Sequence, residues 1–169
     1  QIPGPANGLG IFPCGRFPHS TDEYLELLMM IQTTRFGEIE VKEEQIYSFP
    51  SGILGFPDLN KFLIFAPKPG PFQWLQSIEM GSLAFVVSDP SLFFPDYRVS
   101  VRPPELESIQ LSDVKMGVVL VILTVGKGGV SEITANLQGP LVFNSHAKLG
   151  KQLVLIDSGY TTKHPLVTE

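Results

Sequence analysis

The sequence has little of what catalysis or metal binding requires. Its 169 residues include one cysteine, Cys14, so no disulfide can form within the chain. The three histidines never occur in a His-Glu-x-x-His spacing, and there is no Cys-x-x-Cys pair, so the usual ligand sets of zinc sites are missing. The longest apolar run, Val118 to Val125, is far shorter than the roughly 20 residues that cross a bilayer. We therefore expect no metal, no cofactor and no membrane partner, and a reducing cytoplasm as the compartment.

Charged residues are also scarce. They make up 17% of the chain, and the net charge is −5. An acidic protein is a poor ligand for phosphate backbones, which proteins bind with clustered lysine and arginine, so we expect no direct contact with nucleic acid. A basic protein partner is compatible with this charge. Hydrophobic residues make up 43%, which is the balance of a globular domain with a proper core.

The first residues differ in composition from the rest. Residues 1–18 contain four prolines and four glycines without a helical or strand period, and "HSTDEYLELLMM" then predicts a short helix capped by Ser20 or Thr21. We interpret residues 1–29 as a leader, either non-native or an extension. Residues 30–169 are expected to form a single domain.

From Met30 onward the periodicity is that of β-strands. "QTTRFGEIEVK" predicts a hairpin that turns at Phe36-Gly37, and several short apolar runs end at proline or glycine. Only "PPELESIQL", and less clearly "PDLNKF", predict helices, so the long crossover helices of parallel sheets are missing. The fold class is therefore mostly β: a single-domain antiparallel β-barrel with one or two short helices. The further expected strands are "KFLIFAP", "SLAFVVSDP", "YRVSVRP", "MGVVLVILTV", "EITANLQ", "GPLVFN" and "KQLVLID".

No residue pattern predicts an active site. "GKGG" at Gly126 lacks the frame of a phosphate-binding loop, and no helix follows it. Asp89 and Asp96 are a candidate acid–base pair, but both adjoin proline and are better explained as turn residues. His146 and His164 have no nucleophile motif beside them. We expect that the protein is not an enzyme.

The apolar loops carry more information. "FPSGILGFPD" and "DPSLFFPDY" place aromatic side chains beside prolines, which fix φ and make a loop stiff. A stiff apolar loop at the end of a barrel either plugs the barrel or offers a preformed surface to a partner. Both interpretations apply to the same five residues: Phe49, Ile53, Phe56, Phe93 and Phe94.

Acidic side chains are candidates for contacts with a basic partner. Glu40, Glu43 and Glu44 form the densest cluster, and Glu105 and Glu107 lie on the predicted short helix. Each of them taken singly is equally well explained as part of a solvated surface. We expect a binding face that joins the Phe49–Phe56 loop, the Asp89–Tyr97 loop and nearby acidic residues.

Six blocks follow one another between about Met30 and Val167: "IQTTRFGEIEV", "IYSFPSGILGFPDLNKF", "SDPSLFFPDY", "ITANLQGPLVFN", "KLGKQLVLIDSGY" and "KHPL". In this order they resemble the FliW family of flagellar assembly factors. The resemblance implies a small bacterial cytoplasmic β-barrel without enzyme activity. It implies binding to flagellin and, in the absence of flagellin, binding to the RNA-binding repressor CsrA at a place distinct from its RNA site.

Two alternatives belong to other classes of protein. A barrel that binds a small ligand or a flavin needs a cluster of cationic and hydroxyl side chains for phosphate, and only Arg98 and Arg102 stand close together in the sequence. A structural β-module of a larger assembly would associate with itself. The regulator implied by the resemblance is expected to be a monomer that pairs with its partners on demand.

Overall fold

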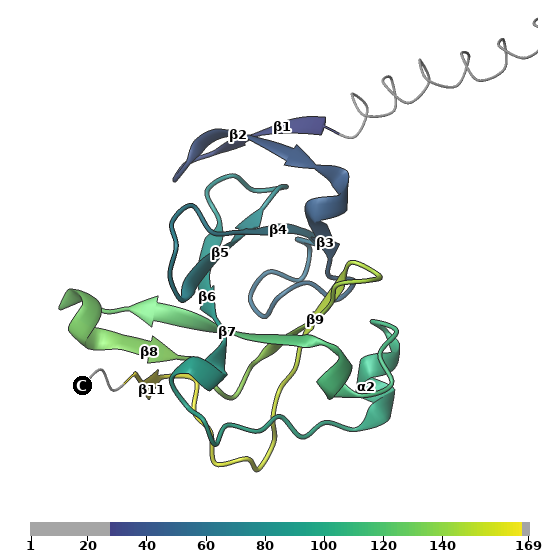
Figure 1. Cartoon of the computed structure of the whole chain (residues 1–169), viewed down its shortest axis with the longest axis vertical. Helices are drawn as coiled ribbons and strands as arrows, with labels where there is room; N and C mark the ends of the chain where they lie inside the picture. Colours follow the sequence, from purple (N-terminus) through teal and green to yellow (C-terminus); the bar gives the residue numbers. More distant parts are fainter. Residues whose placement is uncertain (1–27, 167–169) are drawn as a thin grey trace, which may run out of the picture.

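The computed structural model describes residues 28–166 (Figure 1), so the expectations for residues 1–27 lie outside the described residues. Strands dominate, and α2 (Pro103–Glu107) is a single short helix. Four single turns of 3₁₀-helix are η1 (Glu43–Gln45), η2 (Pro90–Leu92), η3 (Val114–Met116) and η4 (Gly129–Glu132). The strands are β1 (Leu28–Thr33), β2 (Gly37–Lys42), β3 (Ile46–Ser48), β4 (Lys61–Phe65), β5 (Phe72–Ser77), β6 (Ala84–Ser88), β7 (Val118–Val125), β8 (Ile133–Ala135), β9 (Leu141–Asn144), β10 (Leu149–Gln152) and β11 (His164–Pro165).

Strands β3 to β7, β9 and β10 close into a barrel. They follow the order β7-β6-β5-β4-β3-β10-β9, and β9 pairs back with β7 to complete the ring. All of these pairings are antiparallel except that of β3 with β10, where Ser48 lies opposite Leu149. The predicted, mostly antiparallel barrel is confirmed. Figure 1 shows the β1–β2 hairpin above the barrel, β8 and β11 at its left and α2 at its right.

The barrel interior is filled by alternate side chains of its strands. Phe62 on β4, Leu75 on β5 and Phe143 on β9 point inward and are completely or almost completely buried. The rings of Phe62 and Phe143 meet that of Phe49 edge to face, with centroids 5.3 and 5.5 Å apart. Such edge-to-face contacts stabilise aromatic clusters beyond their buried area.

The outward side chains of the barrel are buried by other parts of the chain. Val121 and Leu123 on β7 pack beneath β8 and the segment around Tyr97, and Val142 on β9 packs against Leu106 of α2. The β1–β2 hairpin forms a separate two-stranded sheet. It is held by a smaller cluster of Val41, Ile46 and Leu63, in agreement with the predicted inward side of "EIEV".

Some sequence predictions are wrong. "YRVSVRP" is extended but pairs with no strand, although Tyr97 is buried and Arg98 is exposed as the alternation predicts. "PDLNKF" forms turns and the start of β4 rather than a helix. Strands β3, β5 and β11 were not predicted, and β10 begins two residues earlier than expected and ends at Gln152. In the described part of the chain, no helix has the length and apolar character needed to cross a membrane.

Candidate functional site

The loop that carries two Phe-Pro pairs plugs one end of the barrel. Phe49 and Ile53 are buried in the core, and Phe56 is half-buried against Phe85 of β6. The loop folds back on itself because Ile53 and Phe56 exchange backbone hydrogen bonds of 3.3 and 2.7 Å across Leu54-Gly55. Of the two interpretations of this loop, plugging holds for Phe49 and Ile53, whose burial removes them from any surface that a partner can contact.

The positive φ of Gly52 explains why the plug contains glycine there. Gly52 has φ +65°, and a Cβ at this position would lie 2.5 Å from the carbonyl oxygen of Phe56. Only a residue without a side chain allows the two limbs of the loop to approach so closely. The exposed tip, Leu54, is fixed by its backbone N–H, which donates to Oε1 of Gln152 at 2.8 Å.

The opposite end of the barrel is open. A hollow of about 570 Å³ is lined there by interior-facing side chains such as Tyr47, Ile64 and Phe143. Glu44 of η1 and Lys148 lie on the same hollow, and the Lys148 ammonium stands 5.1 Å from the centre of the Tyr47 ring. The open end therefore combines an apolar interior with charged groups at its edge.

Two members of the acidic cluster, Glu43 and Glu44, lie near this open end. Glu43 and Glu44 are exposed on η1, and Glu43 lines a neighbouring hollow of about 490 Å³. Glu40 is exposed on β2. Among residues 28–166 the only ion pair within 4 Å joins Arg102 and Glu105, so these three carboxylates remain available to an external cation.

The Asp89–Tyr97 loop adjoins the same end from outside the barrel. Val118 of β7 lines both the open hollow and a second hollow of about 470 Å³ that Asp89 and Tyr97 border. In this loop Phe93 stacks on Phe72 with ring centroids 6.2 Å apart, and Phe94 meets the His164 ring at 5.1 Å. Both phenylalanines are half-buried, so each still presents part of its ring to solvent.

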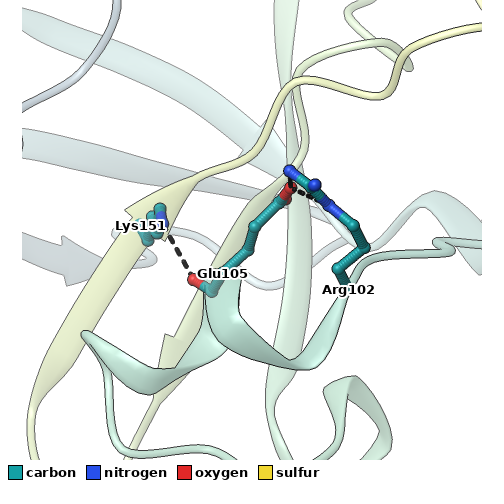
Figure 2. A network of polar contacts seen from close by, with 3 residues as sticks. All are labelled: Arg102, Glu105 and Lys151. Carbon is teal, nitrogen blue, oxygen red and sulfur yellow. Dashed lines mark hydrogen bonds and ion pairs between the residues drawn. The ribbon is translucent and has the colours of Figure 1, made fainter.

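The second acidic element, α2, is tied to the barrel by a small polar network (Figure 2). Arg102 donates to the Glu105 carboxylate from Nε at 3.1 Å and from Nη2 at 2.8 Å. Lys151 of β10 donates from Nζ to the backbone carbonyl of Glu105 at 2.8 Å. The Glu105 charge is therefore already compensated within the chain, whereas Glu107 is exposed and unpaired among the described residues.

The structure thus brings together part of the expected face. Glu43, Glu44 and the Asp89–Tyr97 loop share the open end, while Phe56 lies at the plugged end and α2 lies on the outer wall. Lys148 was not identified from the sequence. A lysine between "SHA" and "LGK" gives no signal of its role, which depends on its proximity to Tyr47 of the neighbouring strand β3.

Asp89, one of the residues considered for catalysis, has a structural role. The Asp89 carboxylate accepts hydrogen bonds from the backbone N–H and the hydroxyl of Ser91 at 2.9 and 2.7 Å, which caps η2. His146 lies in the turn after β9, and His164 lies in β11, so the two histidines belong to different elements. No group of three or more metal-ligating side chains occurs within the part of the chain that the structure describes.

One titratable group has a strongly shifted pKa. Burial raises the pKa of the Tyr97 phenol above its ordinary range, and the neighbouring Tyr160 raises it further. The Tyr97 hydroxyl donates to the Leu137 carbonyl at 2.7 Å, and the two rings lie 4.7 Å apart. The hydroxyl stays neutral and acts as a structural hydrogen-bond donor.

Comparisons with known proteins agree with this architecture. The family model described as FliW protein matches residues 30–166. The chain is 42% identical to a flagellar assembly factor FliW of Natranaerobius thermophilus, over 83% of this chain and 94% of that protein. It is 44% identical to one of Geobacter sulfurreducens, over 81% of this chain and 86% of that protein.

A solved structure is also similar. The crystal structure of the flagellar assembly factor FliW superposes with a TM-score of 0.78 at 38% identity, and the match covers 83% of this chain and 99% of the other. The family model and the relatives match most of the chain, and the barrel described above is the fold they share. The chain therefore belongs to the FliW family of flagellar assembly factors.

Proposed function

We propose that this protein binds flagellin and, when free of flagellin, binds the RNA-binding repressor CsrA and antagonises it allosterically. Flagellin translation is then relieved from repression only after flagellin has been exported. The protein breaks no covalent bond in this scheme and acts in the cytoplasm as a monomer that exchanges partners. The observation that carries the proposal is membership in the FliW family over nearly the whole described chain.

The charge of the molecule supports the CsrA half of the proposal. A protein that holds RNA carries clustered lysine and arginine, so it is attracted over a distance by a chain with a net charge of −5, whichever of its surfaces makes the final contact. Among residues 28–166, Glu40, Glu43 and Glu44 are unpaired and contribute to this attraction. The small-ligand alternative has less support. Among the described residues, Lys148 is the only cation that lines the open hollow, and it shares that hollow with Glu44.

The proposed binding face is centred on the open end of the barrel. It comprises the acidic cluster and the exposed parts of Phe93 and Phe94. Phe56 at the plugged end and Glu105 and Glu107 on α2 are separate surfaces, which a second partner can use. Two partners that use one face exclude each other, and two partners on separate faces do so only if binding is coupled through the barrel.

A competition experiment tests the function. Immobilised protein is loaded with purified CsrA, and flagellin is added in increasing concentration while released CsrA is measured. Release of CsrA by flagellin, and of flagellin by CsrA, is the expected result. Failure of the protein to bind either one refutes the proposal, and a stable complex of all three refutes partner exchange.

Single charge reversals then locate the face. Glu44→Lys, Glu107→Lys and Asp58→Lys change the net charge equally but lie at the open end, on α2 and on the plug loop. We expect the largest loss of CsrA affinity, roughly tenfold, for Glu44→Lys. An equal loss for all three variants would show that only net charge matters, and a larger loss for Glu107→Lys would move the face to α2.

A further inference from the structure

A groove on the outer wall of the barrel is not used by the proposed function. Its floor is a row of side chains that lie opposite one another across neighbouring strands. Trp74 of β5 lies opposite Val86 of β6, and Val86 lies opposite Leu123 of β7. The groove has a volume of about 540 Å³, within the usual size range of sites that bind ligands.

The β1–β2 turn forms one wall of the groove. The Phe36 ring meets Phe65 and Trp74 edge to face at 4.8 and 5.2 Å, and the Arg35 guanidinium stacks over Trp74 at 4.7 Å. These contacts hold the turn against the barrel beside the row of floor residues. The segment Pro67–Pro71, which contains three prolines, borders the groove as a second wall and is stiff for that reason.

Large apolar side chains are exposed around the groove. Phe72 is 38% exposed, Val125 54% and Val130 70%, and all three line it. Exposed apolar side chains scattered singly need no explanation, but a group of them around one hollow marks an interaction surface. The groove therefore favours a partner with an apolar face.

The charge at the groove is opposite to that of the whole molecule. Arg35 and Lys68 line it, and none of its lining residues is acidic, although the chain carries a net charge of −5. Glu132, in the turn after β7, does not line the groove. Its carboxylate accepts a hydrogen bond from the backbone N–H of Gly128 in the same turn, at 2.9 Å. A partner that enters the groove is expected to carry carboxylates beside its apolar face.

The pairing of the strands beneath the groove indicates which backbone conformation the partner adopts. Strands β5, β6 and β7 beneath the groove are each paired on both sides, so the floor offers no strand edge to an incoming chain. An extended peptide would leave its backbone N–H and C=O groups unsatisfied over this apolar floor. A helix satisfies its own backbone groups and presents apolar side chains at i, i+3 or i+4, and i+7.

We propose that the groove between the Arg35-Phe36 turn and Val130 docks an amphipathic helix of another protein. The apolar face of this helix lies on Trp74, Val86 and Val125, and its flanking carboxylates pair with Arg35 and Lys68. This site lies on the outer wall and adjoins the proposed binding face where Phe72 stacks on Phe93. Its lining does not include the acidic cluster, so variants of the groove and variants of the open end can be tested separately.

Trp74 provides a direct measurement, because it is the only tryptophan of the chain and lies on the groove floor. The probe is a capped synthetic helix of about 18 residues, with leucine along one face, glutamate on both flanks and alanine elsewhere. Titration into the full chain is expected to shift the Trp74 emission to shorter wavelength as the indole loses water. The matched control helix has lysine in place of every glutamate and is expected to bind at least about tenfold more weakly.

Variants at the edge of the groove test the site itself. Val130→Asp places a carboxylate on an exposed position of η4 and is expected to weaken binding of the glutamate helix at least about tenfold. Met116→Asp adds the same charge at a position that is 72% exposed and outside the groove, and is expected to leave binding unchanged. Lys68→Glu, in the exposed segment after β4, is expected to weaken the glutamate helix and strengthen the lysine helix.

Three results would overturn the proposal. The first is unchanged Trp74 emission with the glutamate helix at concentrations up to about 1 mM, which corresponds to negligible affinity. The second is equal binding of the glutamate and lysine helices. The third is equal loss of binding for Met116→Asp and Val130→Asp. No flagellin or CsrA enters this experiment, so its outcome is separate from that of the competition experiment.

Discussion

At the residue scale, the barrel interior leaves no space for a side chain at Gly150. A Cβ on this residue of β10 would lie 2.5 Å from Cε1 and 3.0 Å from Cε2 of the Phe49 ring. Phe49 is completely buried and held by Phe62 and Phe143, so its ring has no room to retreat. Glycine is required here because an aromatic face of the plug lies directly on the β10 backbone.

We predict that Gly150→Ala lowers the free energy of unfolding by about 1–3 kcal/mol, the usual cost of overpacking a core. Urea denaturation followed by circular dichroism measures the change. The double variant with Phe49→Leu serves as the control. It should lose less than the sum of the two single variants, because the smaller side chain removes the clash. Strict additivity would contradict the contact between Gly150 and Phe49.

Tyr97 shows how one buried hydroxyl can connect two segments. It joins the loop after β6 to the chain after β8 through its hydrogen bond to the Leu137 carbonyl. Because burial raises its pKa, the folded state holds the phenolic proton more tightly than the unfolded chain does. Its contribution to stability is complete below the unfolded pKa of about 10 and decreases as the pH rises above that value.

For Tyr97→Phe we expect a loss of about 1–2 kcal/mol in the free energy of unfolding at neutral pH, because the Leu137 carbonyl then lacks its partner. The difference from the unaltered protein should shrink as the pH rises above about 10, where the unaltered protein loses stability and the variant has no phenol to titrate at this position. Urea denaturation at neutral and alkaline pH measures both. A difference that stays constant with pH would contradict the raised pKa.

At the scale of elements, the connection of α2 to the barrel depends on Lys151 more than on Arg102. The Arg102–Glu105 ion pair lies on the surface, with 83% of the arginine side chain exposed, and exposed pairs contribute little to stability. Lys151 is half-buried and donates to the backbone carbonyl of Glu105, the middle residue of a helix that has only five residues. Its loss leaves that carbonyl without this partner.

Arg102→Ala should therefore change the free energy of unfolding by less than about 0.5–1 kcal/mol, and Lys151→Met by about 1–2 kcal/mol. Methionine retains most of the aliphatic length of lysine, so the comparison isolates the hydrogen bond. Thermal and urea unfolding of both variants provide the measurement. A larger effect of Arg102→Ala would show that the ion pair, and not the Lys151 hydrogen bond, fixes α2.

The alternation of apolar and polar residues was a better predictor of side-chain burial than of strand pairing. The alternation at Tyr97–Arg102 correctly predicts burial, but the segment makes side-chain contacts with its neighbours and pairs with no strand. Strand β5 was missed because its sequence, "FQWLQS", places glutamine and serine at buried positions. Gln76 is completely buried there and donates to three backbone carbonyls, including that of Leu83 at 3.0 Å. These hydrogen bonds lie in the turn between β5 and β6, and the alternation of apolar and polar residues does not reveal them.

The candidate site was predictable only in part, because the burial of its side chains depends on neighbours from other parts of the sequence. The prolines and aromatic residues in the sequence identified both apolar loops. They do not predict which aromatic ring points into the barrel and which remains at the surface. Phe49 is buried because Gly150 lies beneath it, and Phe93 is half-exposed because its stacking partner, Phe72, is itself at the surface. The groove at Trp74 assembles residues from the first hairpin, β5, β6 and β7, which no sequence motif links.

At the scale of the whole molecule, two surfaces of the barrel carry opposite charge. The open end carries unpaired Glu43 and Glu44, while the groove on the outer wall is lined by Arg35 and Lys68. Complementary charges accelerate the encounter of two proteins and disfavour wrong partners, and they contribute less to the affinity of the final complex. Each surface is therefore suited to a partner of opposite charge.

We predict that association with CsrA slows by roughly tenfold when salt is raised from about 0.02 to 0.2 M, whereas dissociation changes little. Salt screens the attraction that acts over long distances before contact. Stopped-flow or surface plasmon resonance kinetics at several salt concentrations test this. The same measurement on Glu44→Lys should give a shallower salt dependence, and an unchanged dependence would remove the acidic cluster from the encounter.

The closure of the barrel has a consequence for biosynthesis. The ring is sealed where Ser48 meets Leu149 and where β9 returns to β7, and β9 and β10 follow all the other barrel strands in the sequence. Bringing Ser48 and Leu149 together costs conformational entropy, because a long segment lies between them. This entropy is lost before the contacts between the two strands can stabilise the barrel. A ribosome-bound chain that lacks β9 and β10 has the Phe49 ring without its Phe143 and Gly150 neighbours. The nascent protein therefore acquires its core, and with it a defined open end, only after β10 has left the exit tunnel.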